Sequence, residues 1–119
     1  MLNYKDKLVL LQILEFIDEV EEIIGVFGKN FIEFQDNVVF KNALSMSIMQ
    51  IGELKNSLSE DFLISYEGYF EWDRLRRFRN LLAHDYTSIE NENIWGFAIR
   101  RVPELREAIE RVLFEEKMG

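Results

Sequence analysis

The one histidine of this 119-residue chain, His84, lies at the end of a short basic segment. Four of the fourteen basic residues fall within six positions just before it: Arg74, Arg76, Arg77 and Arg79. Guanidinium groups bind phosphate, and imidazole is the side chain that takes up and releases protons near neutral pH. Together they are the smallest set of groups that can hold or cleave a phosphodiester.

The same residues also have a simpler interpretation. Arginines on the exposed face of a helix are usually solvated, and Asp73 lies three and four residues before Arg76 and Arg77, at the spacing of ordinary surface ion pairs. A histidine near the end of a helix is often only a cap. The spacing alone therefore leaves a functional and a structural interpretation open.

The composition is that of an acidic chain with the length of one domain, so we expect a single domain over residues 1–119. The formal net charge is −8, and there is no cysteine. Proteins that coat nucleic acid are usually basic, so any RNA contact should be local to the arginine cluster. No apolar run approaches the ~20 residues of a membrane span, and no signal peptide is recognisable. We expect a cytoplasmic protein that does not associate with membranes.

Apolar residues recur at steps of three and four, which predicts helices. We expect an all-α, up-and-down four-helix bundle with long helices over about residues 3–26, 37–58, 71–84 and 90–117, joined by short links at 29–35, 59–68 and 85–88. Gly25 and Gly28 should end the first helix, and Asp36 or Asn37 should cap the second. Pro103 lies inside the last helix and should kink or break it.

The third predicted helix carries the basic segment and His84. At 100° per residue its core-facing side is formed by Trp72, Leu75, Phe78, Leu82 and Tyr86. Asn80 and His84 fall on the other side, one turn apart, and are therefore neighbours. Arg79 lies on the border between the two sides. Its long side chain can reach toward His84 or lie across the edge of the core.

The pattern Arg79-Asn80-x-x-Ala83-His84-x-Tyr86 resembles the signature of HEPN domains, and in particular of their HepT-like branch. That signature is an arginine, a polar residue that is often asparagine, a short spacer and a histidine, and HepT-like members add a tyrosine two residues later. Ile51-Gly52-Glu53, Trp72 and Ile94-Trp95 also look like this branch. The resemblance covers roughly residues 38–109.

The resemblance implies an all-α bundle that forms a homodimer and brings two motifs to a shared cleft. It further implies a metal-independent endoribonuclease without a cofactor, acting as the toxin of a type VII-like toxin–antitoxin pair. The antitoxin of such pairs is a small MNT-type nucleotidyltransferase. It transfers AMP to the tyrosine of the R-x4-H-x-Y motif, here Tyr86, and silences the toxin. From its position alone, Tyr86 can equally be a packed aromatic residue.

The resemblance and the chemistry of the side chains together suggest roles in RNA cleavage. Arg79 would bind the scissile phosphate and stabilise the charge of the transition state, and His84 would be the general base or acid. Asn80 would orient His84 or hydrogen-bond the phosphate. Because one histidine cannot be both acid and base in one turnover, we expect a dimer to complete the site. Arg76 and Arg77 would guide the RNA backbone.

Several alternatives remain open at the level of sequence. Glu53 can support the site by pairing with Arg79 or Arg76, or it can be a surface carboxylate. A single histidine without a carboxylate cluster is a poor start for a metal site, so we expect none. The acidic run within residues 19–22 is most simply a solvated face. The chain can also be a non-catalytic substrate- or partner-binding subunit of a nucleotidyltransferase, or a purely structural helical dimer.

Overall fold

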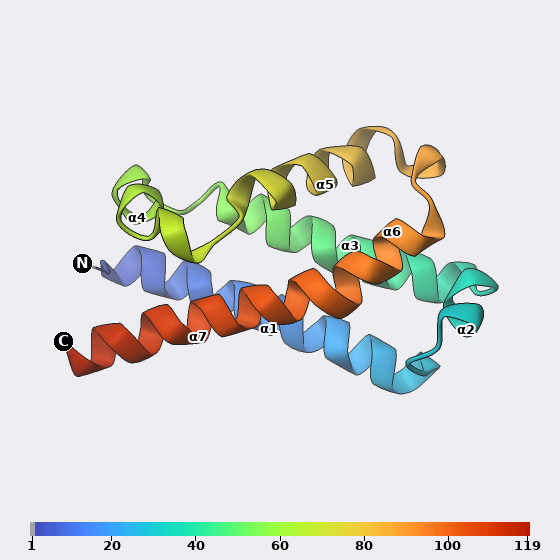
Figure 1. Cartoon of the computed structure of the whole chain (residues 1–119), viewed down its shortest axis with the longest axis horizontal. Helices are drawn as coiled ribbons and strands as arrows, with labels where there is room; N and C mark the ends of the chain where they lie inside the picture. The colour runs from blue at the N-terminus through green and yellow to red at the C-terminus, as the bar shows by residue number, and fades with distance from the viewer. Residues whose placement is uncertain (1) are drawn as a thin grey trace.

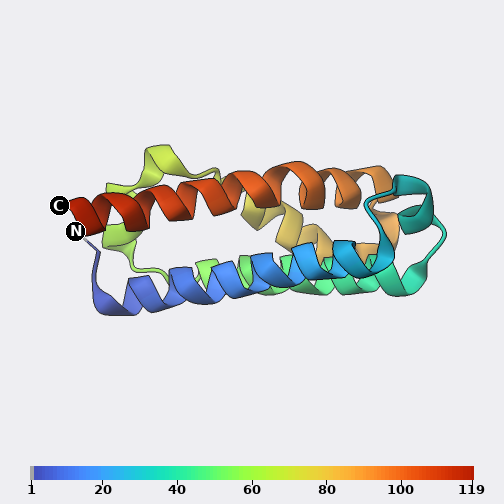
Figure 2. The same ribbon diagram turned by 90° about the horizontal axis from the view of Figure 1, so that it is seen from below.

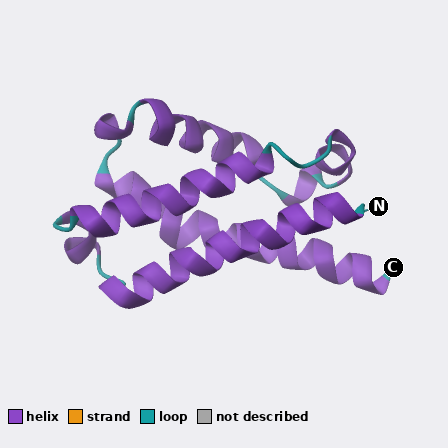
Figure 3. Cartoon of the chain, turned by 180° about the vertical axis from the view of Figure 1, so that it is seen from behind, coloured by secondary structure: helices purple, strands orange, loops and turns teal. Residues whose placement is uncertain are grey.

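The computed structural model describes residues 2–119, and every regular element within them is a helix (Figure 1, Figure 3). The long helices are α1 (Tyr4–Phe27), α3 (Val38–Lys55), α5 (Trp72–His84) and α7 (Val102–Met118). The shorter elements are α2 (Phe31–Gln35), α4 (Glu60–Ser65), η1 (Glu67–Tyr69), η2 (Tyr86–Ser88), α6 (Asn91–Gly96) and η3 (Phe97–Arg101). Because α6 and η3 lead directly into α7, four helical rods run up and down. This arrangement confirms the expected all-α bundle.

Helix α1 begins at a side-chain cap and ends at a glycine. The side chain of Asn3 accepts a hydrogen bond from a backbone N–H of the first turn at 2.7 Å. Gly28 follows the last residue with φ of 103°, in the region that favours glycine. The prediction that Gly25 shares this role is wrong, because Gly25 lies inside the helix. The ring of Phe27, in the last turn, stacks on Phe40 with centroids 4.9 Å apart.

Helix α3 lies alongside α1 and runs in the opposite direction (Figure 2). Of the two candidate caps, Asn37 is the one used, since its side chain accepts two backbone hydrogen bonds of the first turn at 3.0 and 3.1 Å. The helix ends at Lys55, three residues before the predicted end. The backbone N–H groups of the next three residues donate to carbonyls only three positions earlier. The chain therefore leaves the α-helix through a tighter, 3₁₀-type turn.

The link between α3 and α5, expected as a short connector over 59–68, contains two helical elements, α4 and η1. Ser59 caps α4, and its Oγ accepts the Phe62 backbone N–H at 3.1 Å. The Asp6 carboxylate, 2% exposed, accepts hydrogen bonds from the Ser59 N–H at 2.8 Å and the Ser59 hydroxyl at 2.6 Å. These bonds fix the start of α4 to the start of α1.

The break expected near Pro103 is a segment of π-helix, η3, which ends at Arg101. Helix α7 begins at the next residue and continues the rod (Figure 1). The Val102 backbone N–H donates to the Phe97 carbonyl five residues earlier. Pro103 has no N–H to donate and lies in the first turn of α7. The helix therefore accommodates the proline by widening the turn before it.

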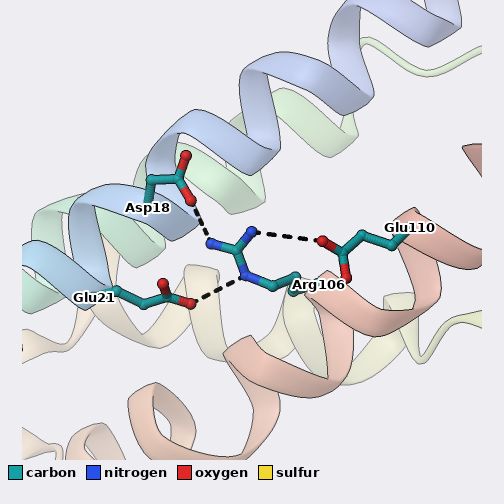
Figure 4. A network of polar contacts seen from close by, with 4 residues as sticks. All are labelled: Asp18, Glu21, Arg106 and Glu110. Atoms are coloured by element: carbon teal, nitrogen blue, oxygen red, sulfur yellow. Dashed lines mark hydrogen bonds and ion pairs between the residues drawn. The ribbon is translucent and has the colours of Figure 1, made fainter.

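Arg106 joins α7 to α1 (Figure 4). It pairs with Asp18, with Glu21 at 3.0 Å and with Glu110 of its own helix at 3.8 Å. The hydrogen bond to Asp18 is the main reason that the pKa of Arg106 is raised. Glu19 accepts a hydrogen bond from α3 at 3.3 Å. The acidic run is thus a solvated face that also holds the bundle together.

Candidate functional site

The basic motif lies where α5 crosses α3, and a glycine sets how closely the two helices approach. Gly52 is buried inside α3, and a Cβ built at this position would lie 2.6 Å from both the Cβ and the Cγ of Arg79. Any larger residue would have to displace the Arg79 side chain. The helix interior usually disfavours glycine, so this close approach explains its presence there.

Arg79 extends across to α3 and pairs with Glu53, the residue after Gly52. Its Nη1 group also donates to the Asn80 side-chain oxygen at 3.3 Å. The Arg79 side chain is 26% exposed and that of Glu53 is 44% exposed, so the pair lies at the surface edge of the helix crossing. Of the orientations left open by the sequence, Arg79 takes the one across the core edge, and Glu53 pairs with Arg79 rather than with Arg76.

Asn80 and His84 are both exposed on the outer side of α5, as the helical projection predicts. His84 is the last residue of the helix, and the next backbone N–H, that of Asp85, bonds to the Leu81 carbonyl at 2.8 Å. Within residues 2–119 no hydrogen bond or ion pair engages the imidazole. The imidazole is therefore accessible to a substrate that approaches the end of α5.

Tyr86 follows α5 and turns back toward α3. Its hydroxyl donates to the Asn42 side-chain oxygen at 2.5 Å, and the Lys41 ammonium lies 5.1 Å from the centroid of its ring. A cavity of about 300 Å³ adjoins the ring and is lined by Asn42, Ser45, Met46, Met49, Leu82 and Tyr86. Tyr86 is half-buried, so it is packed on one side while its hydroxyl stays near the surface.

The other arginines of the cluster lie along the outside of α5. Arg76 is 53% exposed and pairs with Asp73 at 3.7 Å, as the simpler interpretation expects. Arg77 is exposed, and no carboxylate of residues 2–119 lies within ion-pairing distance of it. Arg74 pairs with Glu71 at 3.6 Å. Arg77 is thus the member of this outer row most available to a phosphate.

Sequence reasoning gave no role to Gly52, Asn42 or Lys41, although all three contact candidate site residues. Gly52 did carry a signal, because it is a glycine in the middle of an otherwise regular helix and belongs to the Ile51-Gly52-Glu53 triplet that resembles the HepT-like branch. Asn42 and Lys41 carried no signal, because two neighbouring polar residues on a helix are ordinary.

The side chains of residues 2–119 bear on metal binding, and the helices of the same range bear on membrane insertion. No group of three or more His, Asp or Glu side chains gathers there as ligands would around a metal ion. None of the helices in that range combines the length and the apolar composition that a bilayer crossing needs.

Comparison with known proteins relates most of the helical bundle to one family. The family model described as "Ribonuclease HepT-like" matches residues 13–112, which include the motif on α5. Three curated relatives each carry the name "Putative RNase". No solved structure gives a significant match.

Two of these relatives are from Methanocaldococcus jannaschii. One is 30% identical over 100 residues, covering 83% of this chain and 82% of the relative, and the other is 27% identical over 106 residues, covering 89% and 94%. The third, from Caldanaerobacter subterraneus subsp. tengcongensis, is 27% identical over 108 residues and covers 91% of each chain. With a family match over most of its length and relatives of matching extent, the chain belongs to the HepT-like ribonuclease family.

Proposed function

We propose that this chain is a metal-independent endoribonuclease in which Arg79 and His84 carry out the chemistry at a cleft between two copies. The proposal rests mainly on the way in which neighbouring residues hold the Arg79 side chain in place. Gly52 fits against its stem, and Glu53 and Asn80 hold its guanidinium at the α3–α5 crossing. His84 is exposed at the end of the same helix, one turn beyond Asn80. A fixed cation and a free imidazole on one helix suit phosphodiester cleavage.

In the proposed reaction the 2′-oxygen of a nucleotide attacks the adjacent phosphorus, and the bond from phosphorus to the 5′-oxygen breaks. His84 of one copy takes the proton of the 2′-hydroxyl, and His84 of the second copy gives a proton to the leaving 5′-oxygen. Arg79 stabilises the negative charge that builds up on the phosphoryl oxygens. The products are a 2′,3′-cyclic phosphate and a 5′-hydroxyl.

The outer face of α3 is the part of the surface best suited to the proposed homodimer. Val38, Val39 and Met46 are 67%, 61% and 54% exposed there, and such apolar side chains suit an interface between two copies. Arg79 and Tyr86 both contact α3, so a dimer formed through this face would bring two motifs together. Met46→Glu is expected to give monomers in analytical ultracentrifugation.

The regulatory part of the proposal concerns Tyr86 and an MNT-type nucleotidyltransferase partner. In the transfer, the phenol oxygen attacks the α-phosphorus of ATP, pyrophosphate leaves, and the phenol proton passes to a base. AMP on Tyr86 would add bulk and negative charge beside the motif and exclude RNA. Lys41, already close to the ring, can pair with the new phosphate.

Treatment with the nucleotidyltransferase and ATP tests this regulation. Tyr86→Phe should cleave RNA like the unmodified wild type and stay active after the treatment, whereas the wild type should lose activity. If the treatment silences both proteins equally, Tyr86 is not the acceptor.

The catalytic proposal is tested by RNA cleavage with purified, unmodified protein. Arg79→Ala and His84→Ala should each lower the rate by at least about 10²-fold, the range typical for loss of a charge-stabilising or proton-transferring group. Arg100→Ala, which removes an exposed arginine outside the motif, is the matched control and should cleave normally. If both motif variants cleave like the wild type, the assignment is wrong. A well-folded wild type that cleaves no RNA would instead support the partner-binding role.

A further inference from the structure

A second cavity of about 300 Å³ lies between the first half of α5 and the α6–η3–α7 rod, apart from the cavity at Tyr86. Aromatic and aliphatic side chains form most of its wall, including those of Phe70, Trp72, Leu75, Phe97 and Leu105. This size and lining are typical of a site for a small planar group. None of the roles proposed above uses this cavity.

Trp72, in the wall of this cavity, has a hydrogen-bond donor without a partner among residues 2–119. Its indole ring stacks on Phe70, with centroids 4.3 Å apart and planes 16° from parallel. Its Nε1–H group is buried and has no hydrogen-bond partner among residues 2–119. Buried donors without a partner are uncommon in folded proteins, because water satisfies them in the unfolded chain. Because the Nε1 atom has almost no exposed surface, the cavity meets the face and edge of the indole ring rather than this donor.

The rim of the cavity carries two guanidinium groups that share carboxylates. Arg74 and Arg101 approach Glu71 at 3.6 and 3.8 Å, and Arg101 also pairs with Glu104 at 3.0 Å. These side chains are 38–63% exposed, and such surface pairs are weak, so the guanidinium groups can turn to another acceptor. Two arginines and two glutamates leave the rim without net charge. This suits a neutral group with hydrogen-bond acceptors better than a bare phosphate.

The π-helix η3 forms one side of this cavity. Phe97 and Arg101, the first and last residues of η3, both line it. Segments of π-helix are rare and are found frequently at functional sites, because the widened turn moves side chains away from their α-helical positions. Phe97 also stacks on Phe78 of α5, with centroids 4.3 Å apart and planes 4° from parallel, so the wall is anchored to the motif-bearing helix.

We propose that this cavity binds one unstacked nucleobase of the RNA that the α5 motif cleaves. A nucleobase is planar and neutral, stacks on aromatic rings such as those of Trp72 and Phe97, and carries acceptors for the rim guanidinium groups. Arg74 lies five residues before Arg79 and ten before His84, which is about 7.5 and 15 Å along the helix axis. A short single strand can therefore place one nucleotide at the motif and another in the cavity.

This inference rests on the proposed ribonuclease function, and a variant that fills the cavity tests it separately. Ala108 lines the cavity from α7, so Ala108→Phe should occupy it, whereas Glu107→Phe adds the same ring at the neighbouring exposed position. Binding is measured with short RNAs made uncleavable by 2′-O-methylation, and with free mononucleotides as separate ligands. Cleavage is measured on a long RNA and on a dinucleotide too short to reach the cavity.

We expect Ala108→Phe to weaken binding of the short RNAs about 5- to 150-fold, the range for loss of one base–aromatic stack, and to change the cleavage sites in the long RNA. Dinucleotide cleavage should be unchanged, and Glu107→Phe should behave like the wild type. If Ala108→Phe does not fold, Trp72→Phe leaves a smaller ring for stacking in the same wall and should also weaken binding of the short RNAs.

The inference is overturned if the protein cleaves RNA and Ala108→Phe leaves RNA binding and cleavage sites unchanged. It is also overturned if Ala108→Phe weakens only the binding of free mononucleotides, which would assign the cavity to a free nucleotide. Failure of the ribonuclease proposal gives a different result, because the short RNAs would still bind and still depend on the cavity while no RNA is cleaved.

Discussion

Gly52 and Arg79 are in such close contact that a Cβ on the glycine would lie 2.6 Å from the Cβ of the arginine. Real Cβ atoms essentially never approach other atoms this closely, so either Arg79 or the whole of α5 would have to move to admit a side chain. The next residue, Glu53, holds the guanidinium end of the same arginine. Two consecutive residues of α3 thus fix both the stem and the head of Arg79.

Gly52→Ala is therefore expected to lower RNA cleavage by about 10²-fold, as small displacements of positioned groups do. The cause is displacement of Arg79, so the loss should appear in the rate constant of single-turnover cleavage. Circular dichroism should still report a helical protein.

Gly25→Ala is the matched control, because Gly25 also lies inside a helix but has no atom within 4 Å of its Cβ position. It should keep full activity and gain about 0.5–1 kcal/mol of stability, since alanine favours the helix. Equal activity of the two variants would mean that the contact at Gly52 does not position Arg79.

Glu53→Gln keeps the shape of the side chain and removes its charge. We expect RNA cleavage to fall roughly tenfold because the guanidinium is less firmly oriented. The free energy of unfolding should change by only about 0–1 kcal/mol, since the pair is partly exposed. Urea unfolding and single-turnover cleavage measure the two effects. A large loss of stability with normal cleavage would make Glu53 a structural residue only.

Arg106→Met should destabilise the bundle without affecting cleavage. It removes the pairs that join α7 to α1 and leaves three carboxylates close together (Figure 4). We expect a loss of about 1–2 kcal/mol, smaller at high salt because the pairs are partly exposed. Arg100→Met, at an exposed position of the same rod, should have little effect. Equal stability of the two variants would contradict the role given to Arg106.

The contact between Tyr66 and Glu116 makes stability depend on pH. The Tyr66 hydroxyl donates to Glu116 at 2.7 Å, and this bond is the main reason that the pKa of Glu116 is lowered. Burial, and then the same bond, raise the pKa of Tyr66 to about 12. The stability that Glu116 contributes is present above its unfolded pKa and is lost as the pH falls through the lower, folded value. The contribution of Tyr66 is complete below about pH 10 and is lost as the pH rises toward 12.

Tyr66→Phe removes this contact, so its difference in unfolding free energy from the wild type should be largest between about pH 5 and 9. The difference should shrink in more acidic and in more alkaline solution. Tyr4→Phe, at a tyrosine that is 75% exposed, serves as the control. A difference that stays constant across this range would refute the pH dependence assigned to the pair.

The sequence predicted the helical rods because apolar residues repeat at helical spacing, and it placed Asn80 and His84 correctly on the exposed side of α5. It left the partner of Arg79 open, because that choice depends on how closely α3 approaches α5. The bond from Tyr86 to Asn42 was also beyond prediction, since it joins residues that are distant in the sequence and depends on how the chain turns after α5.

The break at Pro103 was predicted, but its form was not. A missing N–H affects the carbonyls before the proline, so the irregular turn falls at η3 rather than at the proline itself. The sequence pattern identified Pro103 as the cause of the break. It could not reveal that Phe97 of η3 packs on Phe78 of α5, because this is a tertiary contact.

The most direct test of the central claim is cleavage of RNA by the unmodified protein in the presence of a chelator, with the product ends identified. We predict that the wild type produces 2′,3′-cyclic phosphate and 5′-hydroxyl ends under these conditions, and that His84→Ala produces neither. Cleavage that the chelator abolishes, or that His84→Ala carries out at the wild-type rate, would contradict a metal-independent reaction through His84.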